Sequence, residues 1–337
     1  MVRCLRETPP DPFLMLYRPL GKTGIQVSAA SFGAGPVAEL MTDTSRFEDQ
    51  CKTMQRAVEL GINWIDTAAT YGDGRSEESL GGVLQALDLR TKMHVATKVR
   101  IPPESVGDIP GYIHKSVEAS LSRLRLPKVT LLQLHNSITA ERGAQPTSLT
   151  PEDVLGRGGV LTAMNELKSS GAVEHLGLTG LGEPAALVEV LQSRQFETVQ
   201  TPYNLLNPSS GREMPVDFAE TNLGNLFATC REFGVGVFAI RVFAGGALAG
   251  QEPSKHTLTT KFFPLDLFRR DELRASDLAK RLPAGISLRE VALRFAISHP
   301  DVASAIIGFG SPAEVEEAAS YVDKGPLTET ESKLLAS

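Results

Sequence analysis

Four side chains with complementary acid–base chemistry each lie just after a short apolar run in this sequence. They are an acid, a phenol, an amine and an imidazole: Asp66, Tyr71, Lys98 and His135. Each of them alone could have an ordinary structural role, such as a helix cap, a packed ring or a surface lysine. A charge beside a buried strand, however, costs free energy unless it is paired. Their shared position after successive apolar runs therefore indicates one site, at which the four meet and transfer protons.

Carbonyl reduction, or its reverse, needs this combination of groups. Tyr71 would donate a proton to the developing alkoxide, although a phenol with a pKa of about 10 is a weak acid–base group without help. The Lys98 ammonium would lower that pKa, and Asp66 would keep the ammonium charged and oriented. His135 would donate a hydrogen bond to the carbonyl oxygen. Because no side chain supplies a hydride, this chemistry implies a nicotinamide cofactor.

Strand-like runs alternate with amphipathic helices along most of the chain. The runs that predict strands are 29–32, 62–65, 93–97, 130–134, 174–178, 198–200, 236–240 and 304–307. A helical stripe over 45–60 follows Ser45, which with Glu48 predicts a capping box. Eight strand–helix units with apolar strands predict a (β/α)8 TIM barrel, whose active site lies at the C-terminal ends of the strands.

An open, doubly wound sheet is the rival architecture. Such a sheet usually carries a glycine-rich phosphate-binding turn after its first strand. In this chain Gly33 and Gly35 are followed directly by Pro36, and a third glycine is missing. The barrel is therefore favoured.

The chain is expected to form one domain. Residues 1–16, with Pro9, Pro10 and Pro12, predict a poorly ordered extension. Residues 17–28 predict a hairpin, and 17–337 a single barrel domain. Two long loops, 136–159 and 244–270, follow strand ends. The second is rich in Phe and Leu, which favours packing on its own domain and leaves open a substrate or partner surface.

The composition excludes several classes of function. Of the 337 residues, 42% are hydrophobic and 22% are charged, as in globular proteins with a large core. The net charge of −6, without a basic run, argues against nucleic acid or a membrane surface as a partner. No apolar stretch reaches the roughly 20 residues of a membrane span, and no signal peptide is recognisable. Three scattered cysteines make no disulfide framework, so a cytoplasmic location is expected.

From Tyr17 onward the sequence resembles the aldo-keto reductase family. The likeness is carried by Leu-Gly-Lys-Thr-Gly at 20–24, Asn-Trp-Ile-Asp-Thr-Ala at 63–68, Tyr-Gly at 71–72, Ala-Thr-Lys-Val at 96–99, Leu-Gln-Leu-His at 132–135, Gly-Leu-Thr at 177–179 and Gln-Thr-Pro-Tyr-Asn-Leu at 200–205. The resemblance implies a (β/α)8 barrel whose hairpin closes the bottom, NADP(H) or NAD(H) as cofactor, and a catalytic tetrad. The tetrad would be Asp66, Tyr71, Lys98 and His135.

The resemblance also implies where the nicotinamide would bind. Gln200 matches a family position that holds the carboxamide. Thr179 keeps the hydroxyl of a Ser-Asn pair, while Gly180 replaces its amide. Where many members stack an aromatic ring on the nicotinamide, this chain has Arg241, which would stack its guanidinium or hold a phosphate.

The rest of the implied cofactor site consists of a glycine loop and the last helix N-terminus. Gly245 and Gly246 would let backbone amides approach the pyrophosphate, alongside the helix that begins at Ser311, although an ordinary tight turn explains the glycines equally well. Gly308 and Glu314 stand where NADP-preferring members place a Lys and an Arg. A carboxylate there would repel a 2′-phosphate and accept a bond from a 2′-hydroxyl, so the hypothesis is reduced selectivity for NADP, and the choice between NADP(H) and NAD(H) stays open.

Three functions follow in order of preference. The first is an NAD(P)-dependent oxidoreductase acting on an aldehyde, ketone or aldose, similar to the sugar and aldose dehydrogenase branches. The second is a cofactor-binding regulatory subunit, as some channel-attached family members are. A metal hydrolase using Asp66, His135 and His175 is disfavoured, because His175 begins its strand and no His-x-His pair ends one, so no metal is expected. Substrate, direction and oligomeric state do not follow from the sequence.

Overall fold

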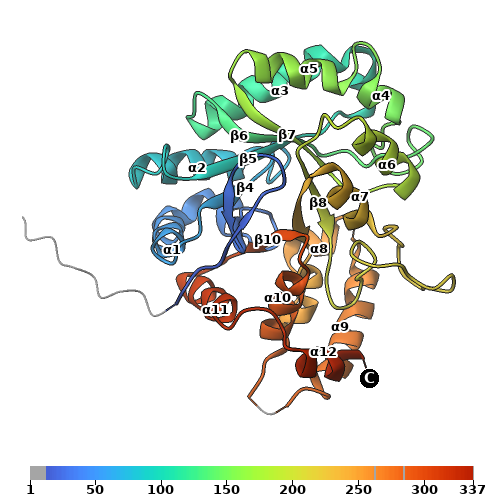
Figure 1. Cartoon of the computed structure of the whole chain (residues 1–337). Coiled ribbons are helices and arrows are strands. Elements are labelled where there is room, and N and C mark those ends of the chain that lie inside the picture. Colours follow the sequence, from blue (N-terminus) through green and yellow to red (C-terminus); the bar gives the residue numbers. More distant parts are fainter. Residues whose placement is uncertain (1–12, 262, 284, 337) are drawn as a thin grey trace, which may run out of the picture.

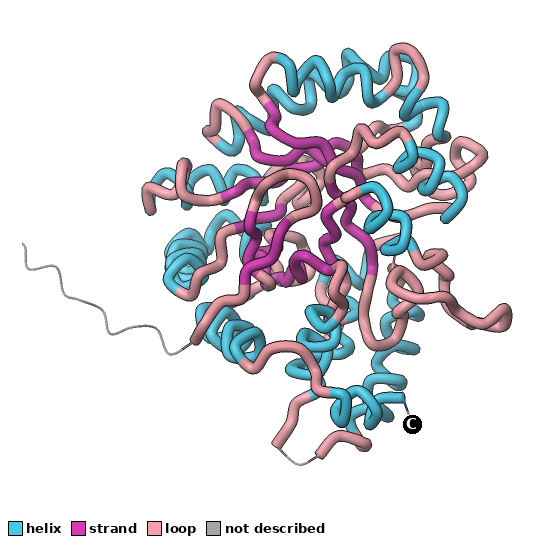
Figure 2. The backbone as a smooth tube through the Cα atoms, in the orientation of Figure 1, coloured by secondary structure: helices cyan, strands magenta, loops and turns pink. Residues whose placement is uncertain are grey.

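Eight parallel strands form a closed barrel in the computed structural model, which describes residues 13–261, 263–283 and 285–336 (Figures 1 and 2). Around the barrel the strands pair in the order β10-β3-β4-β5-β6-β7-β8-β9. Their bounds are β3 (Ala30–Gly33), β4 (Trp64–Asp66), β5 (His94–Val99), β6 (Val129–Leu134), β7 (Val173–Thr179), β8 (Thr198–Pro202), β9 (Gly236–Ile240) and β10 (Val302–Gly308). The predicted TIM barrel is confirmed, and each strand ends within two residues of its predicted bounds.

Helices cover the outside of the barrel (Figure 1). The α-helices are α1 (Phe47–Glu59), α2 (Arg75–Ala86), α3 (Ile109–Leu124), α4 (Pro151–Leu155), α5 (Val160–Ser169), α6 (Pro184–Gln192), α7 (Leu226–Phe233), α8 (Lys255–Thr259), α9 (Leu265–Ala279), α10 (Leu288–Ser298), α11 (Pro312–Asp323) and α12 (Glu329–Ala336). Short 3-10 helices are η1 (Leu40–Thr42), η2 (Thr44–Arg46), η3 (Pro103–Asp108) and η4 (Ala244–Ala249).

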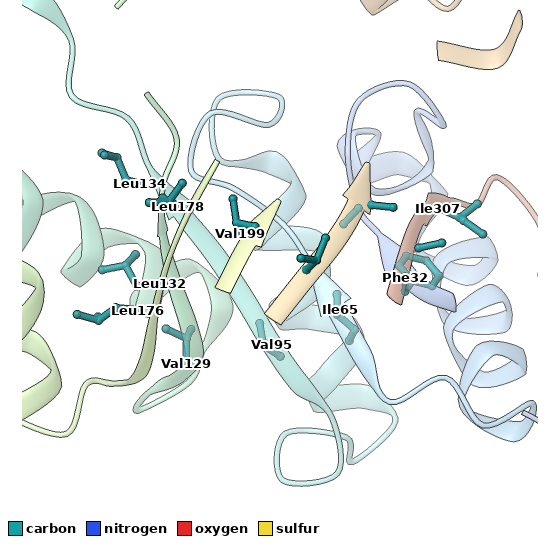
Figure 3. Packing of buried hydrophobic residues seen from close by; sticks show 14 of the residues in the cluster. Phe32, Ile65, Val95, Val129, Leu132, Leu134, Leu176, Leu178, Val199 and Ile307 are labelled. Carbon is teal, nitrogen blue, oxygen red and sulfur yellow. The ribbon is translucent and has the colours of Figure 1, made fainter. Parts of the chain in front are cut away.

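The main core lies between the strands and these helices. Because side chains alternate along a strand, Ile65 points outward into this layer while its neighbours Trp64 and Asp66 point into the barrel. Figure 3 shows Ile65 with Val95, Leu132 and other aliphatic side chains of the layer, all of which belong to one buried cluster. Burial on both faces of the sheet explains why the strands read as apolar runs.

A hairpin closes the bottom of the barrel, as predicted. Its strands β1 (Tyr17–Pro19) and β2 (Gln26–Ser28) pair antiparallel. Leu20 and Val27 are fully buried in one cluster with Trp64 from inside the barrel. Gly21 has a φ of +51°, and a Cβ there would lie 2.2 Å from the backbone nitrogen of Gly236, so only glycine lets the hairpin dock this closely.

Two local predictions need correction. The capping box at Ser45 and Glu48 is wrong: Asp43 accepts a hydrogen bond of 3.0 Å from the Ser45 amide, so 44–46 form η2 and α1 begins only at Phe47. The segment 244–270 is not one loop, since it contains η4, α8 and the start of α9. Its Phe268 is 3% exposed and packs beside Leu248, in line with the favoured interpretation that the segment packs on its own domain.

Most of the predicted extension, residues 1–12, lies outside the described residues. Its last four residues, 13–16, contact the barrel domain: Met15 is 8% exposed, and the Ala29 amide donates a 2.7 Å hydrogen bond to the carbonyl of Leu16. Within the described part of the chain, no helix is both long and apolar enough to cross a bilayer.

Candidate active site

The structure brings the four predicted acid–base side chains together at the C-terminal end of the barrel. The Lys98 Nζ donates a hydrogen bond of 2.5 Å to Asp66 Oδ1 and one of 3.0 Å to the hydroxyl of Tyr71. The Tyr71 ring meets the His135 ring edge-on, with 5.7 Å between centroids. Tyr71 and His135 face the cavity, whereas the side chains of Lys98 and Asp66 beneath them are only 1% and 4% exposed.

Three barrel strands and one loop position these side chains. Asp66 is the last residue of β4 and Lys98 lies within β5, so both belong to strands rather than following them as the sequence indicated. His135 does follow β6, and its amide donates a 2.8 Å hydrogen bond to the carbonyl of Val99. Tyr71 lies on the loop between β4 and α2, where its amide bonds the Ala68 carbonyl at 3.1 Å. The site is therefore built on a rigid sheet.

The Asp66 carboxylate is fully engaged by side chains inside the barrel. Its Oδ1 bonds Lys98, and its Oδ2 accepts a 3.1 Å hydrogen bond from Gln133 and another from Gln200. These bonds offset the cost of burying the charge pair. Gln133 was not predicted as a site residue, although it lies in β6 two residues before His135, a spacing that directs both side chains to the same side of the chain.

Burial determines the protonation state of His135. It lowers the pKa of His135 well below the usual value, and the positive charges of Arg100 and Lys98 lower it further. The imidazole is therefore neutral at neutral pH and has one N–H to donate. Burial also lowers the pKa of Lys98, but Asp66 and Tyr71 outweigh it and leave that pKa raised, so the ammonium stays charged.

A cavity of about 1160 Å³ opens above these residues. Seven of the eight predicted cofactor-binding residues line it: Thr179, Gln200, Arg241, Gly245, Gly246, Gly308 and Glu314. The eighth, Ser311, is not among the lining residues and caps α11, where its hydroxyl accepts a 3.4 Å hydrogen bond from the Glu314 amide. The volume exceeds the usual range for single small-molecule pockets, so a dinucleotide and a small substrate can share it.

The residues of this wall fit a nicotinamide dinucleotide. Thr179 is 2% exposed, and among the described residues its hydroxyl finds no hydrogen-bond partner although it borders the cavity. A carboxamide could satisfy that hydroxyl. Gly245 and Gly246 adopt φ values of +73° and +111° within η4, where a side chain would be strained, so this turn requires glycines.

Arg241 contacts an aromatic ring of the chain itself. Its guanidinium carbon lies 3.4 Å from the centroid of the Phe263 ring, which comes from the segment just before α9. Burial lowers the pKa of Arg241 to about 10, and Asp271 opposes this shift, so the side chain remains a cation at neutral pH. A cation beside the glycine turn of η4 suits a phosphate group.

His175 does not join the site. It lies near the start of β7, opposite Leu131, and its Nδ1 is 2.8 Å from Glu197 Oε1. Asp66 and His135 therefore do not converge with it on a metal. Within the described residues, no three His, Cys, Asp or Glu side chains are grouped so that they could hold a metal ion.

Comparison with known proteins agrees with this geometry. The model of the Aldo/keto reductase family matches residues 30–337. L-galactose dehydrogenase of Arabidopsis thaliana is 27% identical, covering 94% of this chain and 93% of the relative. A probable voltage-gated potassium channel subunit beta of the same plant is 24% identical, with 93% of both chains covered.

A solved structure shows the same fold. The holo form of an aldo-keto reductase from Bacillus halodurans superimposes with a TM-score of 0.72 at 25% identity, covering 96% of both chains. Together with the match to the family model over 30–337, this shows that the chain belongs to the aldo/keto reductase family, a family of oxidoreductases acting on carbonyl and alcohol groups.

Proposed function

We propose that this protein is an NAD(P)-dependent enzyme that interconverts a carbonyl compound and an alcohol, with Tyr71 as the general acid–base. The observation that carries the proposal is the Tyr71 hydroxyl at the cavity floor, 3.0 Å from the Lys98 ammonium. An aldose or a related aldehyde is the substrate class we favour, in line with the named activity of the relative L-galactose dehydrogenase.

Each residue of the tetrad has a separate task. In reduction, Tyr71 donates its proton to the oxygen of the substrate carbonyl, and in oxidation it accepts that proton back. The neutral His135 donates a hydrogen bond to the same oxygen. Lys98 stabilises the deprotonated phenol, and Asp66 fixes Lys98. A bound nicotinamide cofactor, held by Thr179 and Gln200, would supply or accept the hydride.

Steady-state kinetics test this function. We expect the purified protein to oxidise NADH or NADPH with at least some aldehydes or ketones, or to reduce NAD⁺ or NADP⁺ with aldoses, at rates of about 1–10³ s⁻¹. Absorbance at the reduced-nicotinamide band is the measurement. Binding of the cofactor without turnover of any of these aldehydes, ketones and aldoses would disprove the enzymatic proposal.

A cofactor-binding regulatory subunit is the second candidate. The 24% identical probable potassium channel subunit beta favours it. The assembled tetrad favours the enzyme instead, because a purely regulatory subunit has no need of a lysine–tyrosine pair at the cavity floor. Cofactor binding without turnover, in the experiment above, is the result that selects this alternative.

We further propose that the enzyme prefers NAD(H) because of Glu314. This carboxylate lines the cavity at the start of α11, where its Oε2 accepts a 2.6 Å hydrogen bond from the Gly310 amide. Arg289 beside it is bound by two carboxylates, with 3.4 Å to Glu314 and 3.0 Å to Glu317, so its charge is already compensated. A 2′-phosphate would therefore meet a carboxylate, whereas a 2′-hydroxyl could donate to it.

Fluorescence titration distinguishes the two cofactors. We expect NADH to bind about tenfold or more tightly than NADPH, and Glu314→Gln to shrink that difference because it removes the repelling charge. Glu317→Gln is the matched control, since it removes the other carboxylate that binds Arg289 without touching the cavity. Tighter binding of NADPH by the unaltered protein would contradict this assignment.

A further inference from the structure

Gln133 lies inside the barrel next to the Lys98–Asp66 pair, although the mechanism above gives it no task. Its backbone is the register partner of Lys98 in the β5–β6 pairing, so the two side chains leave neighbouring strands on the same face. Gln133 is fully buried, and its Nε2 donates a 3.1 Å hydrogen bond to Asp66 Oδ2. The amide therefore bonds the carboxylate oxygen that Lys98 leaves free, since Lys98 bonds Oδ1.

Only the nitrogen end of the Gln133 amide has a partner. A carboxylate accepts hydrogen bonds and donates none, so the nitrogen must face Asp66. The Oε1 atom is buried and finds no hydrogen-bond partner among the described residues, and the same is true of the Thr198 hydroxyl. Both side chains border Gly177, where a Cβ would lie 2.3 Å from Thr198 Oγ1 and 3.1 Å from Gln133 Cγ. A buried polar atom without a partner calls for an explanation, and a role in the reaction is one.

The Lys98–Asp66 pair can hold its proton in two ways, as ammonium with carboxylate or as neutral amine with carboxylic acid. Burial favours the neutral form, because desolvation disfavours both charges. Hydrogen bonds donated to the carboxylate favour the charged form, and Gln133 and Gln200 both donate to Oδ2. These two amides therefore help to keep the proton on Lys98. The proposed reaction needs that ammonium, because it bonds the Tyr71 hydroxyl at 3.0 Å.

We propose that Gln133 is a positioning residue for the proton transfer, which donates to Asp66 so that Lys98 stays an ammonium beside Tyr71. Gln200 lines the cavity, where the cofactor is proposed to bind it, whereas Gln133 is not among the lining residues. No ligand in the cavity therefore competes for the Gln133 amide. This inference rests on the proposed function and adds a residue to its mechanism.

The variant Gln133→Met removes the amide and keeps the length of the side chain. Oxidation of an alcohol requires the deprotonated phenol of Tyr71, which is less stable beside a lysine that is partly neutral. We therefore expect the midpoint of the pH profile of kcat to move up by about one unit, in line with the loss of one hydrogen bond to a charged group. At pH values below the midpoint, oxidation should be about tenfold slower. L-galactose and D-glucose with NAD⁺ or NADP⁺ are the probes.

Reduction distinguishes this role from a general loss of structure. Reduction requires the protonated phenol, so Gln133→Met should continue to reduce the matching carbonyl compound at a pH about one unit higher than the unaltered protein does. A variant that is merely less folded would lose rate in both directions without any movement of the midpoint. The other charged or titratable groups that face Tyr71, which are Arg100 and His135, are the same in both proteins.

Thr198→Val is the matched control. It removes a fully buried hydroxyl that borders the same glycine as Gln133 but bonds no partner among the described residues, so the midpoint should stay where it is. An unmoved midpoint in Gln133→Met overturns this inference alone, as does an equal movement in Thr198→Val. Failure of Gln133→Met to fold, judged by circular dichroism, would assign the amide to stability and also overturn it. Absence of turnover by the unaltered protein overturns it together with the proposed function.

Discussion

Replacing Tyr71 by Phe is expected to lower kcat by about 10³-fold, within the range that general acid–base catalysis contributes. The phenol oxygen bonded to Lys98 at 3.0 Å is the proton donor of the proposed reaction, and phenylalanine has none. Cofactor affinity should change by less than about threefold, because the residues proposed to hold the cofactor lie on other strands. Single-turnover kinetics and cofactor fluorescence titration of the same preparation measure both quantities.

Tyr112→Phe is the matched control for this variant. Tyr112 lies on α3, outside the cavity, so loss of its hydroxyl should leave kcat within about twofold of the unaltered protein. If Tyr71→Phe kept a near-normal rate, the proton would have to come from another group, and the role proposed for Tyr71 would be wrong.

Replacing Lys98 by Met is expected to reduce the free energy of unfolding by about 3–5 kcal/mol as well as to abolish turnover. The methionine has a similar length but no charge, and it leaves the Asp66 carboxylate buried with only the neutral Gln133 and Gln200 as partners. An uncompensated charge in the barrel interior is the source of the loss. Urea denaturation followed by circular dichroism measures it.

The double variant Asp66→Asn with Lys98→Met separates stability from catalysis. Because it removes both charges, it should recover most of the lost unfolding free energy while remaining inactive. Equal stability of Lys98→Met and the unaltered protein would show that the pair is not buried as described. Recovery of activity in the double variant would exclude a catalytic role for this lysine.

The fold could be predicted because each barrel strand is buried on both faces and therefore forms an apolar run. The exact ends of the strands could not be predicted in this way. Asp66 and Lys98 interrupt the apolar pattern, yet hydrogen bonding of the sheet continues through them, as in the pairing of Lys98 with Gln133. These two polar residues show where the apolar core gives way to the reaction site inside the barrel. They do not show where the strand ends.

The sequence did not reveal which side chains form hydrogen bonds to each other across the barrel. Gln133 interrupts an apolar run, and local pattern alone does not show that it reaches Asp66 on another strand. Gln200 was assigned to the cofactor by resemblance, and in the structure its amide bonds Asp66. Such contacts depend on the closure of the sheet, which brings residues of distant strands face to face.

Helix α9 shows a different limit. Its start at Leu265 lies within a cluster of Phe and Leu residues that resembled an apolar loop rather than a helix. Pro264 immediately before it and Asp266 in its first turn were the available signals, since both residue types favour helix N-termini. The buried face of α9, with Phe268 and Ala275, packs on η4 and not on the barrel, so the strand–helix alternation gave no reason to expect it.

The pairing of β10 with β3, through Ala305 and Ala30, has a consequence for biosynthesis. Strand β3 is the first barrel strand to leave the ribosome, and one of its two neighbours, β10, is the last to be translated. At about 5–20 residues per second, the interval between the synthesis of β3 and that of β10 is roughly 15–60 s. During this time the nascent sheet has an open edge that can pair with other polypeptides, which makes the unfinished chain a natural client for chaperones.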